Sequence, residues 1–126
     1  MLNKGMFTSK TDKWYTPKDF YEKLDAEFHF DFDPCPINPT FDGLSVKWGK
    51  INYMNPPYGR EIVKWVKKAS ENPLTVCLLP ARTDTRWFWD YIYNKPNVEI
   101  RFIKGRLKFG GGKNSAPFPS MIVIFK

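Results

Sequence analysis

The residues with the clearest chemical potential form the tetrapeptide Asn55-Pro56-Pro57-Tyr58, which follows a short apolar run at 51–54. Two consecutive prolines fix the backbone and remove two amide donors, so this turn continues neither a strand nor a helix. Its carbonyls therefore lack nearby partners and can face a ligand, between an amide side chain and a phenol ring. The arrangement suits a planar, polar ligand held at a strand end, where α/β enzymes keep their chemistry. The alternative is a rigid turn that covers a buried tyrosine.

Acidic and thiol side chains supply the other candidates. The stretch 29–33 alternates strictly and predicts a strand, whose last residue, Asp33, points to the open end of a sheet. Asp42 opens an Asp-Gly turn further along the chain. Cys35 and Cys77 lie far apart without metal-ligand spacing, so we expect two reduced thiols of a cytoplasmic protein and no metal site.

A helix is predicted before the first strand. Thr16 can act as its N-cap, and Pro17 suits the first helical position. Apolar residues then recur at i, i+3 and i+7 and give the helix one apolar face. We expect this helix to run from about residue 17 to residue 27.

Strands and helices alternate along the rest of the chain. The expected strands cover 29–33, 51–54, 74–80, 98–103 and 121–125, and the expected helices cover 61–70 and 86–93. The nearly all-apolar run 74–80 is typical of a central strand covered on both faces. We predict an α/β layered fold with a reduced mixed sheet of about five strands and an antiparallel C-terminal strand. Residues 14–126 are expected to form a single domain after a flexible arm at 1–13.

Charge and composition narrow the class of protein. The chain has 126 residues and a formal net charge of +7, with 20 Lys and Arg against 13 Asp and Glu. Such a surplus favours a polyanionic partner such as nucleic acid, with an ordinary solvated basic surface as the alternative. No apolar run approaches the ~20 residues of a membrane span, and the start lacks the apolar core of a signal peptide. We therefore expect a cytoplasmic protein without membrane association.

Several short stretches follow one another in a characteristic order, from about residue 13 to the end of the chain. They are Trp14-Tyr15-Thr16-Pro17, Glu27-Phe28-His29-Phe30-Asp31-Phe32-Asp33-Pro34-Cys35, Asp42-Gly43-Leu44, Asn55-Pro56-Pro57-Tyr58-Gly59, Leu79-Pro80-Ala81-Arg82-Thr83-Asp84-Thr85, Gly105-Arg106-Leu107-Lys108-Phe109 and Ala116-Pro117-Phe118-Pro119-Ser120. Each is weak alone, whereas the ordered set is specific. Together they resemble the small phage-type DNA N6-adenine methyltransferase family, often labelled Dam.

The resemblance implies a compact Rossmann-like fold that binds S-adenosylmethionine and methylates the exocyclic N6 of adenine in DNA. The lone pair of N6 is delocalised into the ring, so two acceptors aimed at its N–H groups would turn the lone pair towards the methyl donor. The implied acceptors are the Asn55 side-chain oxygen and the Pro56 carbonyl, with Pro57 completing the rigid turn. Tyr58 would stack on the base, which must flip out of a duplex to be reached.

The resemblance also implies a cofactor site. Asp33 would face the methionine ammonium of S-adenosylmethionine, and Asp42 would accept from its adenine amino group. The alternative for Asp33 is an acid that only caps a helix or shapes a turn, and the alternative for Asp42 is a simple Asp-Gly turn. Thr16 could reach the methionine carboxylate or could only cap its helix. Further cofactor contacts are implied at Pro17, Pro34, Cys35 and Leu44.

Basic and aromatic residues near the C-terminus are the candidate DNA contacts. They are Arg82, and Arg106, Lys108, Phe109 and Lys113 in the Gly-rich loop 105–119. Lysine and arginine there would meet phosphates, which set affinity but not sequence preference. Phe109 could close over a flipped base or could belong to the core.

Alternative functions remain open beside an active DNA methyltransferase. One is a weakly active or inactive methyltransferase-like module that only binds nucleic acid, and another is methyl transfer to RNA or a free nucleotide. Only eight residues separate Asp33 from Asp42, and Pro34-Cys35-Pro36 replaces the usual glycine-rich turn. These departures slightly favour the binding module, whereas the intact tetrapeptide opposes it. We expect a monomer or small homo-oligomer, encoded by a phage or prophage in a bacterial host.

Overall fold

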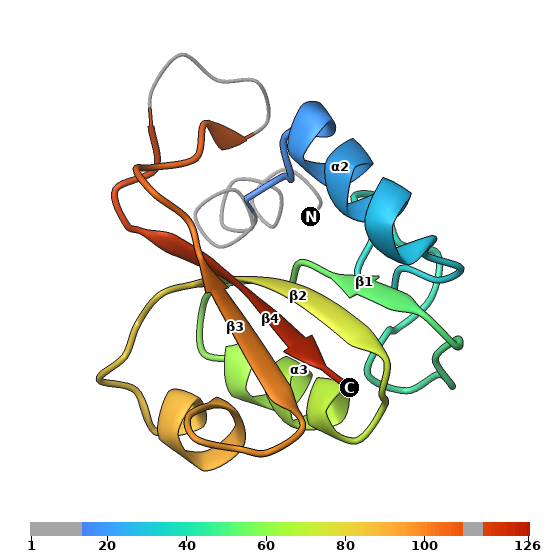
Figure 1. The fold of residues 1–126 in the computed structure, drawn as a ribbon. Helices are drawn as coiled ribbons and strands as arrows, with labels where there is room; N and C mark the ends of the chain where they lie inside the picture. The colour runs from blue at the N-terminus through green and yellow to red at the C-terminus, as the bar shows by residue number, and fades with distance from the viewer. Residues whose placement is uncertain (1–13, 110–114) are drawn as a thin grey trace, which may run out of the picture.

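The computed structural model describes residues 14–109 and 115–126, so the predicted arm at 1–13 and Lys113 lie outside the described residues. The helices and strands follow one another along the chain as Figure 1 labels them. They are α2 (Lys18–Phe28), β1 (Asn52–Met54), α3 (Ile62–Ser70), β2 (Thr75–Pro80), the π-helix η1 (Phe88–Ile92), β3 (Val98–Phe102) and β4 (Ser120–Phe125).

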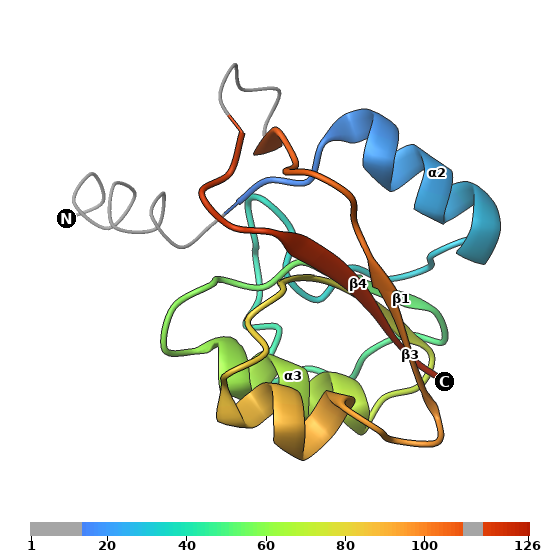
Figure 2. The same ribbon diagram turned by 60° about the vertical axis from the view of Figure 1, so that its left-hand side comes forward.

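Within the described ranges the sheet is open and mixed, with four strands in the order β1-β2-β4-β3. β1 pairs with β2 in parallel, and β4 lies antiparallel to both β2 and β3. Figure 2 shows α2 on one side of this sheet and α3 with η1 on the other. The prediction of a layered α/β fold with an antiparallel C-terminal strand is confirmed, while the Rossmann-like assignment stays a prediction.

The core lies where the two central strands meet. Every residue of β2 and of β4 is buried, which confirms that 74–80 contains a central strand covered on both faces. α3 adds Ile62, Trp65, Val66 and Ala69 from its apolar face. Because one face of the sheet is covered by α2 and the other by α3 with η1, the chemistry is confined to the ends of the strands and the loops that follow them.

The predicted strand at 29–33 is wrong, which is why the sheet has four strands and not five. This segment runs beside β1 but makes only an isolated parallel bridge, between Phe32 and Asn52. Two backbone bonds join the segments, from the Asp31 amide to the Ile51 carbonyl and from the Tyr53 amide to the Phe32 carbonyl. The Asp31 side chain accepts from the amides of Lys50 and Ile51 at 3.1 and 3.2 Å, so part of the pairing runs through a side chain and not through the backbone. Pairing ends at the proline that follows Asp33, because proline has no amide to donate.

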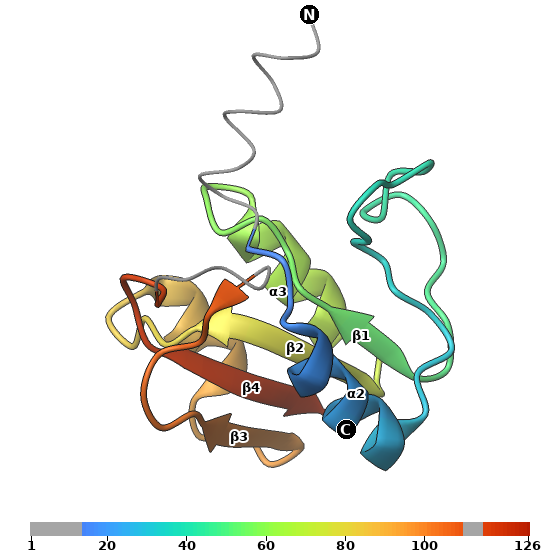
Figure 3. The same cartoon turned by 90° about the horizontal axis from the view of Figure 1, so that it is seen from above.

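The predicted N-cap is also wrong. α2 begins at Lys18 with Pro17 in the N-cap position, and no side chain caps the helix. The hydroxyl of Thr16 is directed instead towards β1, where it bonds Tyr53. Figure 3 shows the segment before α2 passing near the end of β1, and the loop 34–50 extending beyond the outer edge of that strand. None of the helices in the described ranges is long and apolar enough to cross a membrane.

Gly43 fixes the loop 34–50 against α3. A Cβ at this position would lie 1.9 Å from the Pro34 carbonyl oxygen and 2.7 Å from Trp65 Cη2. The Gly43 carbonyl also accepts from the Trp48 indole N–H at 2.8 Å. The close approach of the two chain segments therefore requires a residue without a side chain.

Replacing Gly43 by alanine is expected to lower the free energy of unfolding by about 1–3 kcal/mol, because the loop must move to admit the methyl group. Urea unfolding followed by tryptophan fluorescence measures the change. Gly105→Asn is the matched control, since nothing lies within 4 Å of a Cβ there and asparagine tolerates its φ of +77°. Equal stability of Gly43→Ala and the wild type would contradict this packing.

Candidate active site

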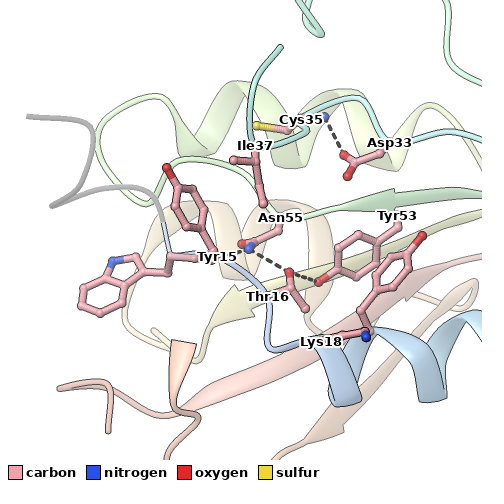
Figure 4. A pocket seen from close by; sticks show the side chains of 10 residues that line it. Tyr15, Thr16, Lys18, Asp33, Cys35, Ile37, Tyr53 and Asn55 are labelled. Carbon is pink, nitrogen blue, oxygen red and sulfur yellow. Dashed lines mark hydrogen bonds between the residues drawn. The ribbon is translucent and has the colours of Figure 1, made fainter. Parts of the chain in front are cut away.

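A pocket of about 280 Å³ opens where the segment before α2, the end of β1 and the loop after Asp33 meet (Figure 4). This volume is close to the lower end of the ~300–1,000 Å³ typical of small-molecule sites. The pocket is lined by Trp14, Tyr15, Thr16, Lys18, Tyr21, Asp33, Cys35, Ile37, Tyr53 and Asn55. Of the predicted site residues, the structure therefore brings together Thr16, Asp33, Cys35 and Asn55.

Asn55 is held by its amide nitrogen. Nδ2 donates to the carbonyl of Trp14 and, at 3.1 Å, to Oγ1 of Thr16. A carbonyl can only accept, so the bond to Trp14 fixes which end of the amide is the nitrogen. Within the described part of the chain Oδ1 is buried and has no hydrogen-bond partner. Both donors of the amide are thus used, and its acceptor is not.

The strand register explains why the turn leaves carbonyls unpaired. Asn52 lies opposite Thr75 and donates to the Leu74 carbonyl at 2.9 Å, as a parallel ladder requires. Continuing this register places Pro56 opposite Leu79, where its ladder partners are the Leu78 carbonyl and the Pro80 nitrogen. Neither proline carries an N–H, so both bonds are missing. The Pro56 carbonyl is left without a ladder donor, as the sequence pattern predicts.

Tyr58 provides a donor for the Leu78 carbonyl, which Pro56 cannot serve. Its hydroxyl donates to the Leu78 carbonyl at 2.9 Å, and its side chain is only 4% exposed. The ring contacts Phe118 and Phe109 edge-on, with centroids 5.6 and 6.4 Å away. Burial raises the pKa of Tyr58 well above its usual value, so the phenol stays protonated. In this structure Tyr58 is a core residue beside the turn, and its stacking on a base stays a prediction.

An aromatic cluster packs beside the turn. It consists of Trp14, Tyr58, Phe109 and Phe118. The Trp14 ring lies edge-on to Phe109 and Phe118, with centroids 5.6 and 5.1 Å away. Phe109 is 9% exposed, which corresponds to the core alternative for this residue. The cluster joins the segment before α2 to the C-terminal loop and so fixes the Trp14 carbonyl that binds Asn55.

Asp33 and Cys35 form the wall opposite Thr16 and Tyr53. The Cys35 amide donates to Asp33 Oδ1 at 2.8 Å, which turns the chain sharply after the bridge beside β1. Because that bridge is parallel to β1, Asp33 and Asn55 reach the same edge of the sheet. A carboxylate residue, a thiol residue and Asn55 therefore line one small cavity.

The remaining predicted cofactor residues lie outside the pocket lining. Asp42 is in an exposed turn, where Oδ1 accepts from the Leu44 amide at 3.0 Å and Oδ2 from the Ser45 hydroxyl at 2.8 Å. The Ser45 bond, with the Leu44 amide second, lowers the pKa of Asp42. Pro34 is buried beneath Gly43, and Pro17 leads into α2. Asp42 therefore lies outside the lining of the pocket that contains Asp33, and its contact with the cofactor stays a prediction.

The basic candidates gather near the turn. Arg82 is exposed, donates to the Tyr58 carbonyl at 3.3 Å and lies 5.6 Å from the Phe118 ring centroid. Arg106 is exposed and donates to the Ala116 carbonyl at 3.4 Å, and Lys108 is exposed as well. The positive groups thus border the same end of the sheet as Asn55.

Sequence reasoning gave no site role to the other residues that line the pocket. These are Trp14, Tyr15, Lys18, Tyr21, Ile37 and Tyr53. Tyr53 could have been found, because residues two apart on a strand point to the same face and Asn55 follows it by two. The rest depend on where the segment before α2 crosses the sheet, for which the sequence carries no local signal. In the described parts of the chain, no group of three or more His, Cys, Asp or Glu residues could hold a metal ion.

Comparison with known proteins gives one family. A family model described as DNA N-6-adenine-methyltransferase (Dam) matches residues 5–126. A search of curated proteins found no match.

Tyr58→Phe is expected to lower the free energy of unfolding by about 1–3 kcal/mol, because the buried Leu78 carbonyl loses its donor. Chemical denaturation measures the loss, and Tyr93→Phe is the control because Tyr93 is 48% exposed. A Tyr58→Phe protein as stable as the control would show that the hydroxyl does not serve the Leu78 carbonyl.

Proposed function

Because the chain belongs to the DNA N-6-adenine-methyltransferase (Dam) family, we propose that it methylates N6 of adenine in DNA at the pocket around Asn55. The observation that carries the proposal is the buried Oδ1 of the pocket residue Asn55, which has no hydrogen-bond partner among the described residues while both hydrogens of Nδ2 are used. An acceptor held in this way suits an incoming N–H group, and the exocyclic amine of adenine carries two.

The chemistry requires acceptors and no covalent catalyst. Asn55 Oδ1 accepts one N–H of the amine and the Pro56 carbonyl accepts the other, which directs the nitrogen lone pair away from the ring. Both acceptors are fixed before the substrate arrives, one by Trp14 and Thr16 and the other by the proline turn. Such preorganised dipoles stabilise the developing charge without reorganising during the reaction. The new N–C bond would form as the methyl–sulfur bond of the donor breaks, with the thioether S-adenosylhomocysteine as leaving group, and the amine would lose one proton to solvent.

S-adenosylmethionine supplies the methyl group in this proposal. The fit rests on the mixed lining of the pocket, which combines the carboxylate of Asp33 and the ammonium of Lys18 with the rings of Tyr15 and Tyr21. Asp33 would hold the methionine ammonium, with Thr16 and Cys35 beside it. We also propose cofactor contacts beyond the pocket lining, from Pro17, Pro34, Asp42 and Leu44.

DNA is proposed to approach along the basic end of the sheet. Arg82, Arg106 and Lys108 are exposed there and would meet phosphates, as would Lys113. A target base must leave a duplex to reach Asn55. Stacking of that base on Tyr58 requires displacement of Phe118 or Phe109, since both cover the Tyr58 ring.

Asn55→Ala is expected to lower methyl transfer to DNA by about 10²–10³-fold, the usual effect of removing one preorganised polar group. Incorporation of labelled methyl from S-adenosylmethionine into adenine measures the loss. Asn97→Ala is the control, because Asn97 is exposed and lies on the far side of the fold beside the last residue of the chain. Full activity of Asn55→Ala would contradict the proposed mechanism. Label that appears only in RNA would show that the methyl acceptor is RNA and not DNA.

Alkylation of Cys35 reports binding at this pocket without any need for turnover. Iodoacetamide is expected to modify Cys35, which lines the pocket, and not Cys77, which is fully buried and whose thiol pKa is raised by burial. Saturating S-adenosylhomocysteine should slow the modification at least tenfold, as measured by mass spectrometry. Asn55→Ala should show the same protection. Unchanged alkylation in the presence of S-adenosylhomocysteine would support a module that binds nucleic acid alone.

A further inference from the structure

We propose that Tyr53 and Thr16 are positioning residues that hold the amide of Asn55 with its oxygen towards the pocket. The inference rests on the proposed function, because it concerns the acceptor that would receive the amine. Neither side chain needs to touch the substrate for this role. Both act through the nitrogen end of the amide.

A single hydrogen bond does not fix the plane of an amide. The bond from Nδ2 to the Trp14 carbonyl excludes a flipped amide, since two acceptors would then face each other. It still leaves rotation about the line that joins the two atoms. The second bond, from Nδ2 to Thr16 Oγ1 at 3.1 Å, fixes the plane and therefore the direction of Oδ1.

Thr16 needs a partner of its own to keep that second bond. Its segment lies before α2, and its hydroxyl takes no part in capping that helix. The Tyr53 hydroxyl lies 2.6 Å from Thr16 Oγ1 and is the side-chain group that anchors it. Figure 4 shows the three side chains connected in this order, from Asn55 through Thr16 to Tyr53.

Tyr53 is a rigid anchor. Its side chain is 2% exposed, and its backbone belongs to β1. Tyr21 lies edge-on to the Tyr53 ring at a centroid distance of 5.0 Å, and Phe30 packs at 5.2 Å. Burial also raises the pKa of Tyr53, so its hydroxyl keeps its hydrogen throughout the physiological range. The network therefore does not change with pH near neutrality.

The competing explanation is purely structural, because the Thr16–Tyr53 bond also ties the N-terminal segment to the sheet. The two roles predict changes in different measured quantities. A positioning role lowers kcat and leaves cofactor binding unchanged, whereas a structural role lowers kcat, cofactor affinity and stability together. The conservative variant Thr16→Ser keeps the hydroxyl, and it gives a further test that distinguishes the positioning role from the structural role.

The experiment compares Tyr53→Phe, Thr16→Val and Thr16→Ser in the full chain. We expect kcat for DNA methylation to fall about tenfold in the first two and to recover in Thr16→Ser. The Kd of S-adenosylhomocysteine should stay within twofold of the wild type in Tyr53→Phe, which keeps the cofactor contact proposed for Thr16. The double variant Tyr53→Phe/Thr16→Val should be no slower than Thr16→Val, because both changes remove the same constraint. Tyr91→Phe is the control, since Tyr91 lies in η1, away from the pocket.

A second readout does not depend on turnover. The side-chain NH₂ hydrogens of Asn55 should exchange slowly with solvent in the wild type and at least tenfold faster in Tyr53→Phe, as measured by NMR. A Tyr53→Phe protein with wild-type kcat and exchange would overturn the proposal, as would parallel losses of kcat, cofactor affinity and stability. Absence of methyl transfer by the wild type would overturn the proposed function and the positioning role together.

Discussion

The site depends on the point at which the hydrogen-bond ladder between β1 and β2 stops. Pro56 and Pro80 stand at the positions where the next two amides would donate, so the pairing ends for a covalent reason. This interruption leaves two backbone carbonyls without ladder donors, and the two differ in what lies beside them. The Leu78 carbonyl is taken by the Tyr58 hydroxyl, and the Pro56 carbonyl stays beside Asn55. One defect in the ladder thus creates both the rigidity of the turn and its capacity to accept hydrogen bonds.

The other half of the site comes from the segment that crosses the end of β1. Its residues supply the acceptors for the Asn55 amide, through the Trp14 carbonyl and the Thr16 hydroxyl. The Trp14 ring is fixed in turn by Phe109 and Phe118, which belong to the C-terminal loop. Segments from both ends of the described chain therefore meet at the turn. A change in either segment is transmitted to Asn55 through packing and not through direct contact.

Local signals in the sequence predicted much of this fold, and long-range contacts account for the failures. The apolar run of β2, the amphipathic face of α3 and the proline turn after β1 are set by neighbouring residues, and each was predicted correctly. The segment 29–33 alternates like a strand, yet the Asp31 carboxylate binds the amides of Lys50 and Ile51, and only one parallel bridge to β1 forms. Thr16 has the chemistry of an N-cap, but Tyr53 lies 37 positions away and competes for its hydroxyl. No local pattern reveals that competition.

An unpaired acceptor alone does not identify an active site. Within the described residues two buried side-chain atoms lack partners, Asn55 Oδ1 and Ser120 Oγ. Each costs the fold about 1–3 kcal/mol relative to a satisfied group. Ser120 lies in the ladder opposite Pro80, contributes nothing to the pocket lining, and its hydroxyl can rotate. The Asn55 oxygen cannot rotate away, because two bonds hold the nitrogen of the same amide. A fold that fixes a buried acceptor in this way, on a residue that lines a pocket, favours the binding of a donor there.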